Sequence, residues 1–365
     1  MSDIFVFFAR FQTVIMNKIL VTGGCGFIGS HTLVDLIENG YQVISADNNS
    51  RSHIQILNGV EKITGVKVKN YIVDLCNFDD TCAIFQENPD LKGIIHFAAY
   101  KAVGESVENP LMYYENNLNS LLNLLRCAND FKIPHFVFSS SCTVYGNPDE
   151  IPVTEKTTFK PAESPYGNTK QMGEEIIQHT IHAHPNIKAI LLRYFNPVGA
   201  HPSAEIGEIP IGKPANLVPA ITQTAIGKLS QMKVWGNDYP TRDGSCIRDY
   251  IHVCDIAHAH TLALNLMQQS NNSLDVFNLG TGNGYTVLEV INSFEKVSGK
   301  KLNYQIASRR PGDVVAIYAN NDKAKNILHW IPRYSLEDMM KTAWAWEVKL
   351  KEDDNLFGAV KAALN

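Results

Sequence analysis

Short apolar runs alternate with longer amphipathic segments over the first half of the chain, starting at Asn17. The runs that predict strands are Lys18–Thr22, Gln42–Asp47, Tyr71–Asp74, Gly93–Phe97, His135–Ser139 and Lys188–Arg193. The segments that predict helices are Ile28–Asn39, Leu111–Asp130 and Tyr166–His184. This alternation is typical of βαβ units, in which helices cover both faces of a parallel sheet. The runs are continuously apolar, as strands buried on both faces should be. We therefore predict an α/β fold with a doubly wound parallel sheet.

The pattern changes after Arg193. Residues 196–214 are rich in proline and glycine, which indicates a loop. The helices expected beyond it are Leu217–Gly227, Asp255–Gln268, Val287–Ser298 and Leu336–Glu347. They predict a smaller, mixed C-terminal domain for substrate, although Val276–Asn278 could return to the main sheet. We expect an extension at 1–16, a first domain at 17–196, a second at 197–350 and a tail at 351–365.

Length and composition agree with a two-domain protein that has no polyanionic partner. The chain has 365 residues and a net charge of −5, without a basic block, which argues against nucleic-acid binding. The 7 cysteines form no CxxC pair and the histidines do not cluster, so we expect reduced thiols and no metal. Ile4–Ala9 is too short to span a membrane, and Asp3 is unsuited to a signal peptide. We expect a cytoplasmic protein without a membrane anchor.

A glycine-rich turn follows the first predicted strand. Gly23, Gly26 and Gly29 have GxxGxxG spacing and lead into a helix. Such a turn lets backbone N–H groups approach a pyrophosphate at the helix N-terminus, as in Rossmann-type folds. Asp47 ends the second strand, where a carboxylate binds the adenosine ribose and repels a 2′-phosphate, so NAD is favoured over NADP. Asp47 could also simply cap its strand, and for Asp74 a contact to adenine and a structural role are equally plausible.

A second group of polar residues follows the fifth predicted strand. Ser141 lies in a serine-rich strand end, and Tyr166 and Lys170 are one helical turn apart, so they share a helix face. A free phenol has a pKa near 10 and is a poor base at neutral pH, but a nearby ammonium favours the phenolate. Ser141 could hold a substrate hydroxyl in line with Tyr166. A YxxxK pattern alone is usually a solvated helix face; after a glycine turn, a strand-end acid and a serine-rich strand end it predicts catalysis.

These features together resemble the short-chain dehydrogenase/reductase family in its extended form. Longer segments narrow the resemblance to the UDP-glucose 4-epimerase family, and it extends from about Asn17 almost to the C-terminus. These segments are 101–107 (KAVGESV), 113–117 (YYENN), 192–203 (LRYFNPVGAHPS), 235–241 (WGNDYPT), 248–253 (RDYIHV) and 309–313 (RRPGD).

The resemblance implies roles for individual residues. It implies that Tyr166 is the acid/base, Ser141 its hydrogen-bonding partner, and Lys170 the residue that tunes Tyr166 and binds the nicotinamide ribose. With Gly26 and Gly29, the implied NAD contacts are Gly23, Phe27, Ile28, Asp47, Asp74, Phe97, Lys101, Asn116 and Phe195. The implied UDP-sugar contacts are Asn196, Asn216, Arg248, Arg310 and Asp313. Guanidinium groups suit a diphosphate, so we expect substrate in the cleft between the domains.

The resemblance also implies an isomerase of galactose metabolism that interconverts UDP-glucose and UDP-galactose through a transient 4-keto sugar. A homodimer is implied as well, through 111–130 and 166–184 as a four-helix interface, although both apolar stripes could be internal core. The alternatives are a sugar-nucleotide 4,6-dehydratase, a reductase, or an NAD-sensing binding protein. Ser141 lacks the neighbouring Asp-Glu pair of a dehydratase, and a non-catalytic sensor would usually have lost Tyr166 or Lys170. Ile317 occupies the position that gates the sugar pocket in the family, and its intermediate size leaves tolerance of N-acetylated sugars open.

Overall fold

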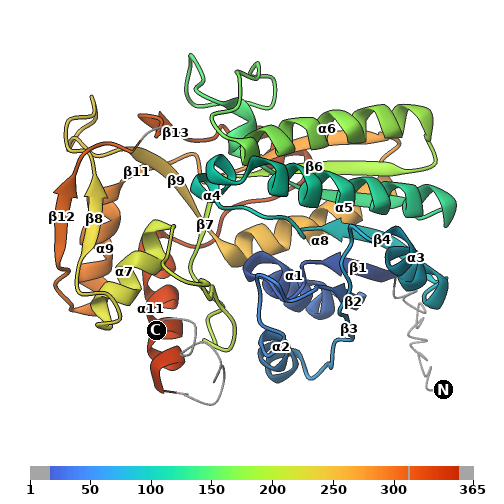
Figure 1. Ribbon diagram of the computed structural model, residues 1–365, viewed down its shortest axis with the longest axis horizontal. Helices are drawn as coiled ribbons and strands as arrows, with labels where there is room; N and C mark the ends of the chain where they lie inside the picture. The colour runs from blue at the N-terminus through green and yellow to red at the C-terminus, as the bar shows by residue number, and fades with distance from the viewer. Residues whose placement is uncertain (1–16, 311–312, 353–365) are drawn as a thin grey trace, which may run out of the picture.

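The computed structural model describes residues 17–310 and 313–352. Its main sheet has seven strands in the order β10-β6-β5-β4-β1-β2-β3 (Figure 1), and every pair is parallel. The strands are β1 (Lys18–Thr22), β2 (Gln42–Ala46), β3 (Asn70–Tyr71), β4 (Leu91–His96), β5 (His135–Ser141), β6 (Lys188–Tyr194) and β10 (Leu274–Leu279). The predicted doubly wound parallel sheet is therefore confirmed, and β10 contains the returning segment 276–278.

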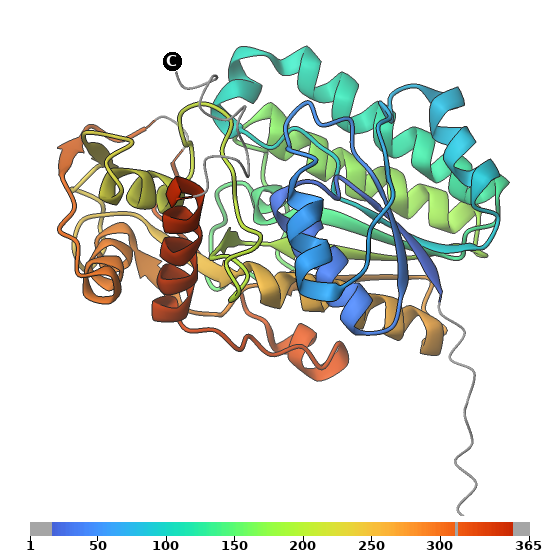
Figure 2. The ribbon, with the colours of Figure 1, turned by 90° about the horizontal axis from the view of Figure 1, so that it is seen from below.

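Helices cover both faces of this sheet (Figures 1 and 2). One face carries α1 (Phe27–Glu38), α2 (Ile56–Thr64), α8 (Val253–Gln269) and α10 (Asp322–Ile327). The other carries α3 (Phe78–Glu87), α4 (Val103–Glu108), α5 (Pro110–Asp130) and α6 (Pro165–Ala183). In β1, Ile19 and Val21 join the core under the first layer while Leu20 joins the core under the second. Burial on both sides explains why the predicted strands are continuously apolar.

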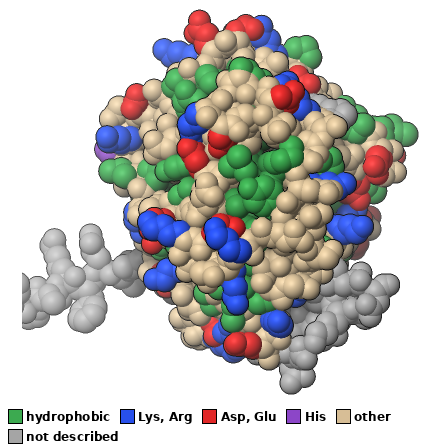
Figure 3. All heavy atoms as spheres, turned by 90° about the vertical axis from the view of Figure 1, so that its left-hand side faces the viewer, with side chains coloured by type: hydrophobic (Ala, Val, Ile, Leu, Met, Phe, Trp, Pro, Cys, Tyr) green, Lys and Arg blue, Asp and Glu red, His purple; other side chains and the backbone are tan. Residues whose placement is uncertain are grey.

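The smaller unit is built around β9 (Ile247–His252). This strand pairs antiparallel with β11 (Gly284–Thr286) and parallel with β7 (Asn196–Val198) and β13 (Ala316–Ile317). A parallel pair, β8 (Met232–Trp235) and β12 (Tyr304–Ala307), lies at the far side. The helices are α7 (Leu217–Ala225), α9 (Val287–Ser298) and α11 (Leu336–Glu352). Hydrophobic side chains gather on the face that carries β8 and β12 (Figure 3), where β12 exposes Tyr304 and Ile306. The predicted smaller mixed unit is thus confirmed.

Several details differ from the sequence prediction. β3 ends at Tyr71 rather than Asp74, because it is an edge strand and Asp74 turns the chain by accepting a hydrogen bond from the Cys76 N–H (2.9 Å). α8 lies within the predicted second domain, which starts at residue 197, but it packs against α1 on one face of the main sheet. The chain therefore returns to the first unit before α9 begins. The domain limits themselves stay predictions. The extension at 1–16 and the tail from 353 lie outside the described residues.

No helix within 17–310 or 313–352 is long and apolar enough to cross a membrane. In the same ranges, no three His, Cys, Asp or Glu side chains are grouped closely enough to hold a metal ion.

Candidate active site

A cavity of about 450 Å³ lies at the carboxyl ends of the main-sheet strands, beside the segment that leads into the smaller unit. This is where parallel α/β sheets bind ligands. Every predicted NAD contact is on its wall, namely Gly23, Gly26, Phe27, Ile28, Gly29, Asp47, Asp74, Phe97, Lys101, Asn116, Tyr166, Lys170 and Phe195. Ser141, Asn196 and Asn216 line it too. The structure therefore brings together residues spread over nearly 200 positions of sequence.

The glycine turn fits a diphosphate. Gly23 has φ +70°, and a Cβ on Gly29 would lie 2.1 Å from the Gly23 carbonyl oxygen, so α1 packs directly on the turn. Gly26 is the N-cap of α1 and provides no side chain to cap it. The first N–H groups of α1 are thus left for an anion, on the side where the helix dipole is positive.

Asp47 connects the second strand to this turn. Its carboxylate accepts hydrogen bonds from the Cys25 N–H (3.0 Å), the Asn49 N–H (2.9 Å) and the Ser52 hydroxyl (2.8 Å). It is nearly buried and lines the cavity, so it fixes the loop and presents a carboxylate at the same place. The structural and the ligand-binding interpretations are therefore compatible.

The predicted catalytic residues meet where β5 ends and α6 begins. Ser164 caps α6 by accepting a hydrogen bond from the Gly167 N–H (3.1 Å), and Pro165 opens the helix, which sets the position of Tyr166. The Lys170 Nζ donates to the Ser139 carbonyl oxygen (2.6 Å) and lies 5.9 Å from the centre of the Tyr166 ring. Lys170 therefore joins α6 to the strand that carries Ser141.

Burial has the largest effect on the pKa of both Tyr166 and Lys170. It raises the pKa of Tyr166 to about 12, although the hydrogen bond with Ser141 opposes this shift. Burial also lowers the pKa of Lys170 to about 8, opposed by the negative charge of Glu174. Without NAD, burial is the largest influence on the phenol, and the Lys170 ammonium donates to the Ser139 carbonyl oxygen; the role of Lys170 in favouring the phenolate therefore stays a prediction. A positively charged nicotinamide beside the phenol would lower the Tyr166 pKa.

A buried ion pair behind Lys170 was missed by the sequence analysis. Glu174 and Arg193 are both nearly inaccessible and form two hydrogen bonds, Nε to Oε1 (2.9 Å) and Nη2 to Oε2 (2.6 Å). The Ser140 hydroxyl donates to the same carboxylate (2.5 Å), and Arg193 also donates to the Tyr145 hydroxyl (2.9 Å). The pair therefore connects α6, β5 and β6 directly beneath Ser141.

Three predicted UDP-sugar contacts form a separate cluster. Asp313 pairs with Arg310 (Nε to Oδ2, 3.0 Å) and with Arg248 (Nη2 to Oδ1, 3.4 Å). Arg248 lies on β9 beside Ile317, which is buried among Phe195 and its neighbours. None of Arg248, Arg310, Asp313 and Ile317 lines the 450 Å³ cavity. Their contact with substrate therefore stays a prediction, and the two guanidinium groups leave the cluster with a net positive charge.

Comparisons with known proteins identify the family of the chain. The family model described as GDP-mannose 4,6 dehydratase matches residues 20–343. UDP-glucose 4-epimerase of Bacillus subtilis (strain 168) is 48% identical over 329 residues, covering 90% of this chain and 96% of its own. UDP-glucose 4-epimerase uge1 of Schizosaccharomyces pombe is 46% identical over 91% of this chain and 94% of its own. The chain belongs to the UDP-glucose 4-epimerase family.

A solved structure of the family shows the same fold. The crystal structure of UDP-glucose 4-epimerase from Bifidobacterium longum in complex with NAD+ and UDP superposes with a TM-score of 0.88 at 45% identity, covering 91% of this chain and 98% of that one. The resemblance drawn from the glycine turn and the YxxxK pattern is thus confirmed at the level of family and fold.

Proposed function

We propose that this protein is an isomerase that interconverts UDP-glucose and UDP-galactose, with NAD held in the 450 Å³ cavity. The observation that carries the proposal is the placement of Tyr166 and Ser141 on the wall of the cavity that the glycine turn also lines. The relatives named above support the substrate, and the Bifidobacterium longum complex supports the cofactor.

When bound, NAD accepts a hydride from the sugar and returns it. The chain itself binds, orients and moves the proton. Tyr166 takes the proton of the sugar 4-hydroxyl, and Ser141, within hydrogen-bonding reach of the phenol, holds that hydroxyl in line. Lys170 is fixed by the Ser139 carbonyl and keeps positive charge near the phenol when it is protonated. The proton returns from Tyr166 once the sugar has presented its other face.

UDP serves as the part of the substrate that stays fixed. Arg248 and Arg310 suit a diphosphate because guanidinium groups form paired, charge-assisted hydrogen bonds with phosphate oxygens. Asp313 holds both side chains in position before substrate arrives.

The surroundings of Ser141 disfavour dehydration, although the matching family model is named for a dehydratase. Elimination of water needs an acid and a base next to the catalytic hydroxyl residue. Here Ser140 is hydrogen-bonded to the buried Glu174, and burial raises the pKa of the Cys142 thiol to about 12. The two neighbours of Ser141 are thus a serine and a cysteine, in place of the Asp-Glu pair of a dehydratase.

The direct test is incubation of the purified protein with UDP-galactose, followed by separation of the nucleotide sugars. We expect UDP-glucose to form without a stoichiometric requirement for added NAD or NADH. A keto-deoxy sugar as product would establish the dehydratase instead, and consumption of one NADH per turnover would establish a reductase. A parallel incubation with UDP-N-acetylgalactosamine measures how far Ile317 restricts the sugar.

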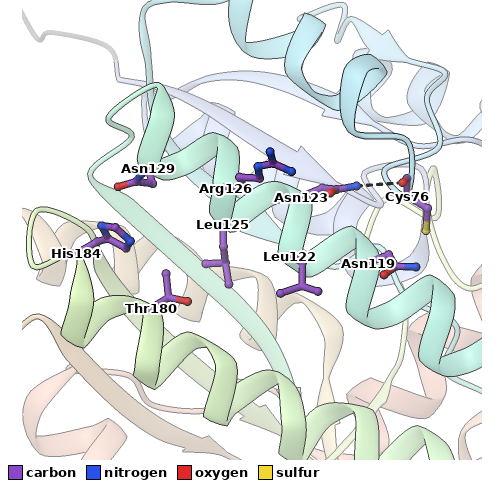
Figure 4. Close-up of a pocket in the computed structure, with 9 residues that line it drawn as sticks. All are labelled: Cys76, Asn119, Leu122, Asn123, Leu125, Arg126, Asn129, Thr180 and His184. Atoms are coloured by element: carbon purple, nitrogen blue, oxygen red, sulfur yellow. Dashed lines mark hydrogen bonds between the residues drawn. The ribbon is translucent and has the colours of Figure 1, made fainter.

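We also propose a homodimer through α5 and α6, which is supported by exposed apolar side chains on both helices. Leu111 and Leu122 on α5 and Met172 on α6 are 72%, 47% and 36% exposed. A hollow of about 500 Å³ lies where the two helices meet, and Figure 4 shows Leu122 and Leu125 pointing from α5 towards α6. Light scattering should give twice the chain mass, and Leu122→Arg should give the monomer. A wild-type monomer at micromolar concentration would contradict the proposal.

A further inference from the structure

Glu208 connects two predicted ligand contacts across the rim of the cavity. Its Oε1 accepts hydrogen bonds from the Lys101 Nζ (3.2 Å) and from the Asn216 Nδ2 (3.1 Å). Lys101 is a predicted NAD contact and Asn216 a predicted UDP-sugar contact, and all three residues line the cavity. We call this three-residue arrangement the rim contact.

The segment that carries Glu208 is clamped between the two units. Residues 205–208 follow β7 and pass between α2 and α11, as the yellow-green loop in Figures 1 and 2 shows. A Cβ on Gly59 of α2 would lie 2.2 Å from the Glu205 carbonyl oxygen, and one on Gly207 would lie 2.4 Å from the Trp346 ring of α11. Ile206 is fully buried, so the backbone that positions Glu208 is fixed on both sides.

The partners of Glu208 belong to different parts of the fold. Lys101 lies between β4 and α4 on the main sheet, and its side chain is 59% exposed. Asn216 is the N-cap of α7 in the smaller unit, yet its side chain makes no capping hydrogen bond and instead donates to Glu208. Asparagine at this position usually caps its own helix. The Asn216 side chain therefore links α7 to the segment that carries Glu208.

The geometry is compatible with bound ligands. A lysine ammonium has three donors and Glu208 takes one of them, which leaves two for a ribose or phosphate oxygen. Glu208 links two side chains on the cavity wall that are predicted to contact different ligands, so a ligand that crosses the rim has to separate them. An ion pair that affected only the stability of the fold would not change the rate at which ligand enters or leaves the cavity.

We propose that Glu208 is a positioning residue that keeps the rim of the cavity closed between Lys101 and Asn216 and so slows the release of NAD. The inference rests on the proposed function, because an epimerase that lost NAD with a keto sugar bound could not finish the reaction. The closed rim is a property of this chain that turnover alone would not reveal.

The test compares NAD release from three full-length proteins. Each is loaded with labelled NAD, diluted into excess unlabelled NAD, and sampled for retained label. Glu208→Gln removes the charge that holds Lys101 but keeps the shape, and we expect release about fivefold faster, since such exposed contacts contribute at most about a factor of ten. Glu205→Gln is the matched control: it lies in the same segment and pairs with Lys62 (3.3 Å) and Lys349, but touches neither Lys101 nor Asn216. Its release rate should stay within about twofold of the wild type.

Each outcome decides a specific point. Faster release from Glu208→Gln alone supports the rim contact. Equal or slower release from Glu208→Gln overturns it, and so does an equal acceleration in Glu205→Gln, because the cause would then be a general loosening of residues 205–208. A wild-type protein that binds no labelled NAD would instead overturn the proposed function. Thermal unfolding of all three proteins checks that the fold is intact.

Discussion

Replacement of Glu174 by glutamine tests whether the buried ion pair holds the catalytic residues in place. The substitution keeps the side-chain shape but leaves the Arg193 guanidinium, 4% exposed as a residue, without a counter-charge. Among the described residues, the remaining partners of Arg193 are uncharged: the Tyr145 hydroxyl (2.9 Å), the Glu155 carbonyl oxygen (3.3 Å) and the rings of Tyr145 and Phe159. Loss of one partner from a buried pair costs about 3–5 kcal/mol. Because glutamine can still accept one hydrogen bond, we expect the free energy of unfolding to fall by about 3 kcal/mol.

Urea unfolding at pH 7 measures this change, with Glu175→Gln as the matched control. Glu175 is the next residue of α6 and is exposed, so its substitution should change the free energy of unfolding by less than about 0.5 kcal/mol. A loss below about 1 kcal/mol in Glu174→Gln would refute the reasoning, since the guanidinium would then be solvated or otherwise compensated. The activity of the folded variant adds a second readout. Glu174 raises the pKa of Lys170, so its removal should move the alkaline limb of the pH–rate profile to lower pH.

Three further outcomes follow from the site. Gly29→Ala should weaken the affinity for NAD at least about tenfold, because its Cβ would lie 2.1 Å from the Gly23 carbonyl oxygen. Gly104→Ala is the control, since a Cβ there meets open space, and its affinity should stay unchanged. Equal affinities of the two variants would contradict the role of the glycine turn. Burial lowers the pKa of Lys170 to about 8, so its ammonium is present below that pH and kcat/KM should decline above it. Lys170→Arg should lack this decline, and a persisting limb would assign it elsewhere. Ile317→Ala should increase turnover of UDP-N-acetylgalactosamine relative to UDP-galactose. Because Ile317 packs in a buried cluster, the substitution should also lower the free energy of unfolding by about 2–5 kcal/mol. An unchanged ratio of the two rates would show that residue 317 does not restrict the sugar.

Much of the first unit could be predicted because its signals are local. Ile19, Leu20 and Val21 face opposite layers of core, and that arrangement requires the continuous apolar run seen in the sequence. The glycine spacing and the Tyr166–Lys170 interval similarly depend on one turn and one helix. Such features are set within a few residues, so a single sequence suffices to find them.

The missed features depend on distant partners. α8 has an ordinary amphipathic pattern, which does not say that its apolar face meets α1 rather than the smaller unit. Glu174 follows Lys170 by one helical turn, a spacing that places both on one face, but its partner Arg193 comes from β6. Glu208 lies in a proline- and glycine-rich loop that passes between α2 and α11, and no hydrophobic periodicity in the sequence predicts this path. The raised pKa of Tyr166 also depends on residues far apart in the sequence, because burial is a property of the folded cavity.

The central claim is that the Tyr166 hydroxyl transfers the proton in the cavity that holds NAD. Tyr166→Phe removes that oxygen alone, so we expect kcat for UDP-galactose to fall by about 10²–10⁴-fold while the amount of bound NAD stays equal to that of the wild type. If the phenylalanine variant binds NAD normally and still converts UDP-galactose at the wild-type rate, residue 166 is not the acid/base and the account is contradicted.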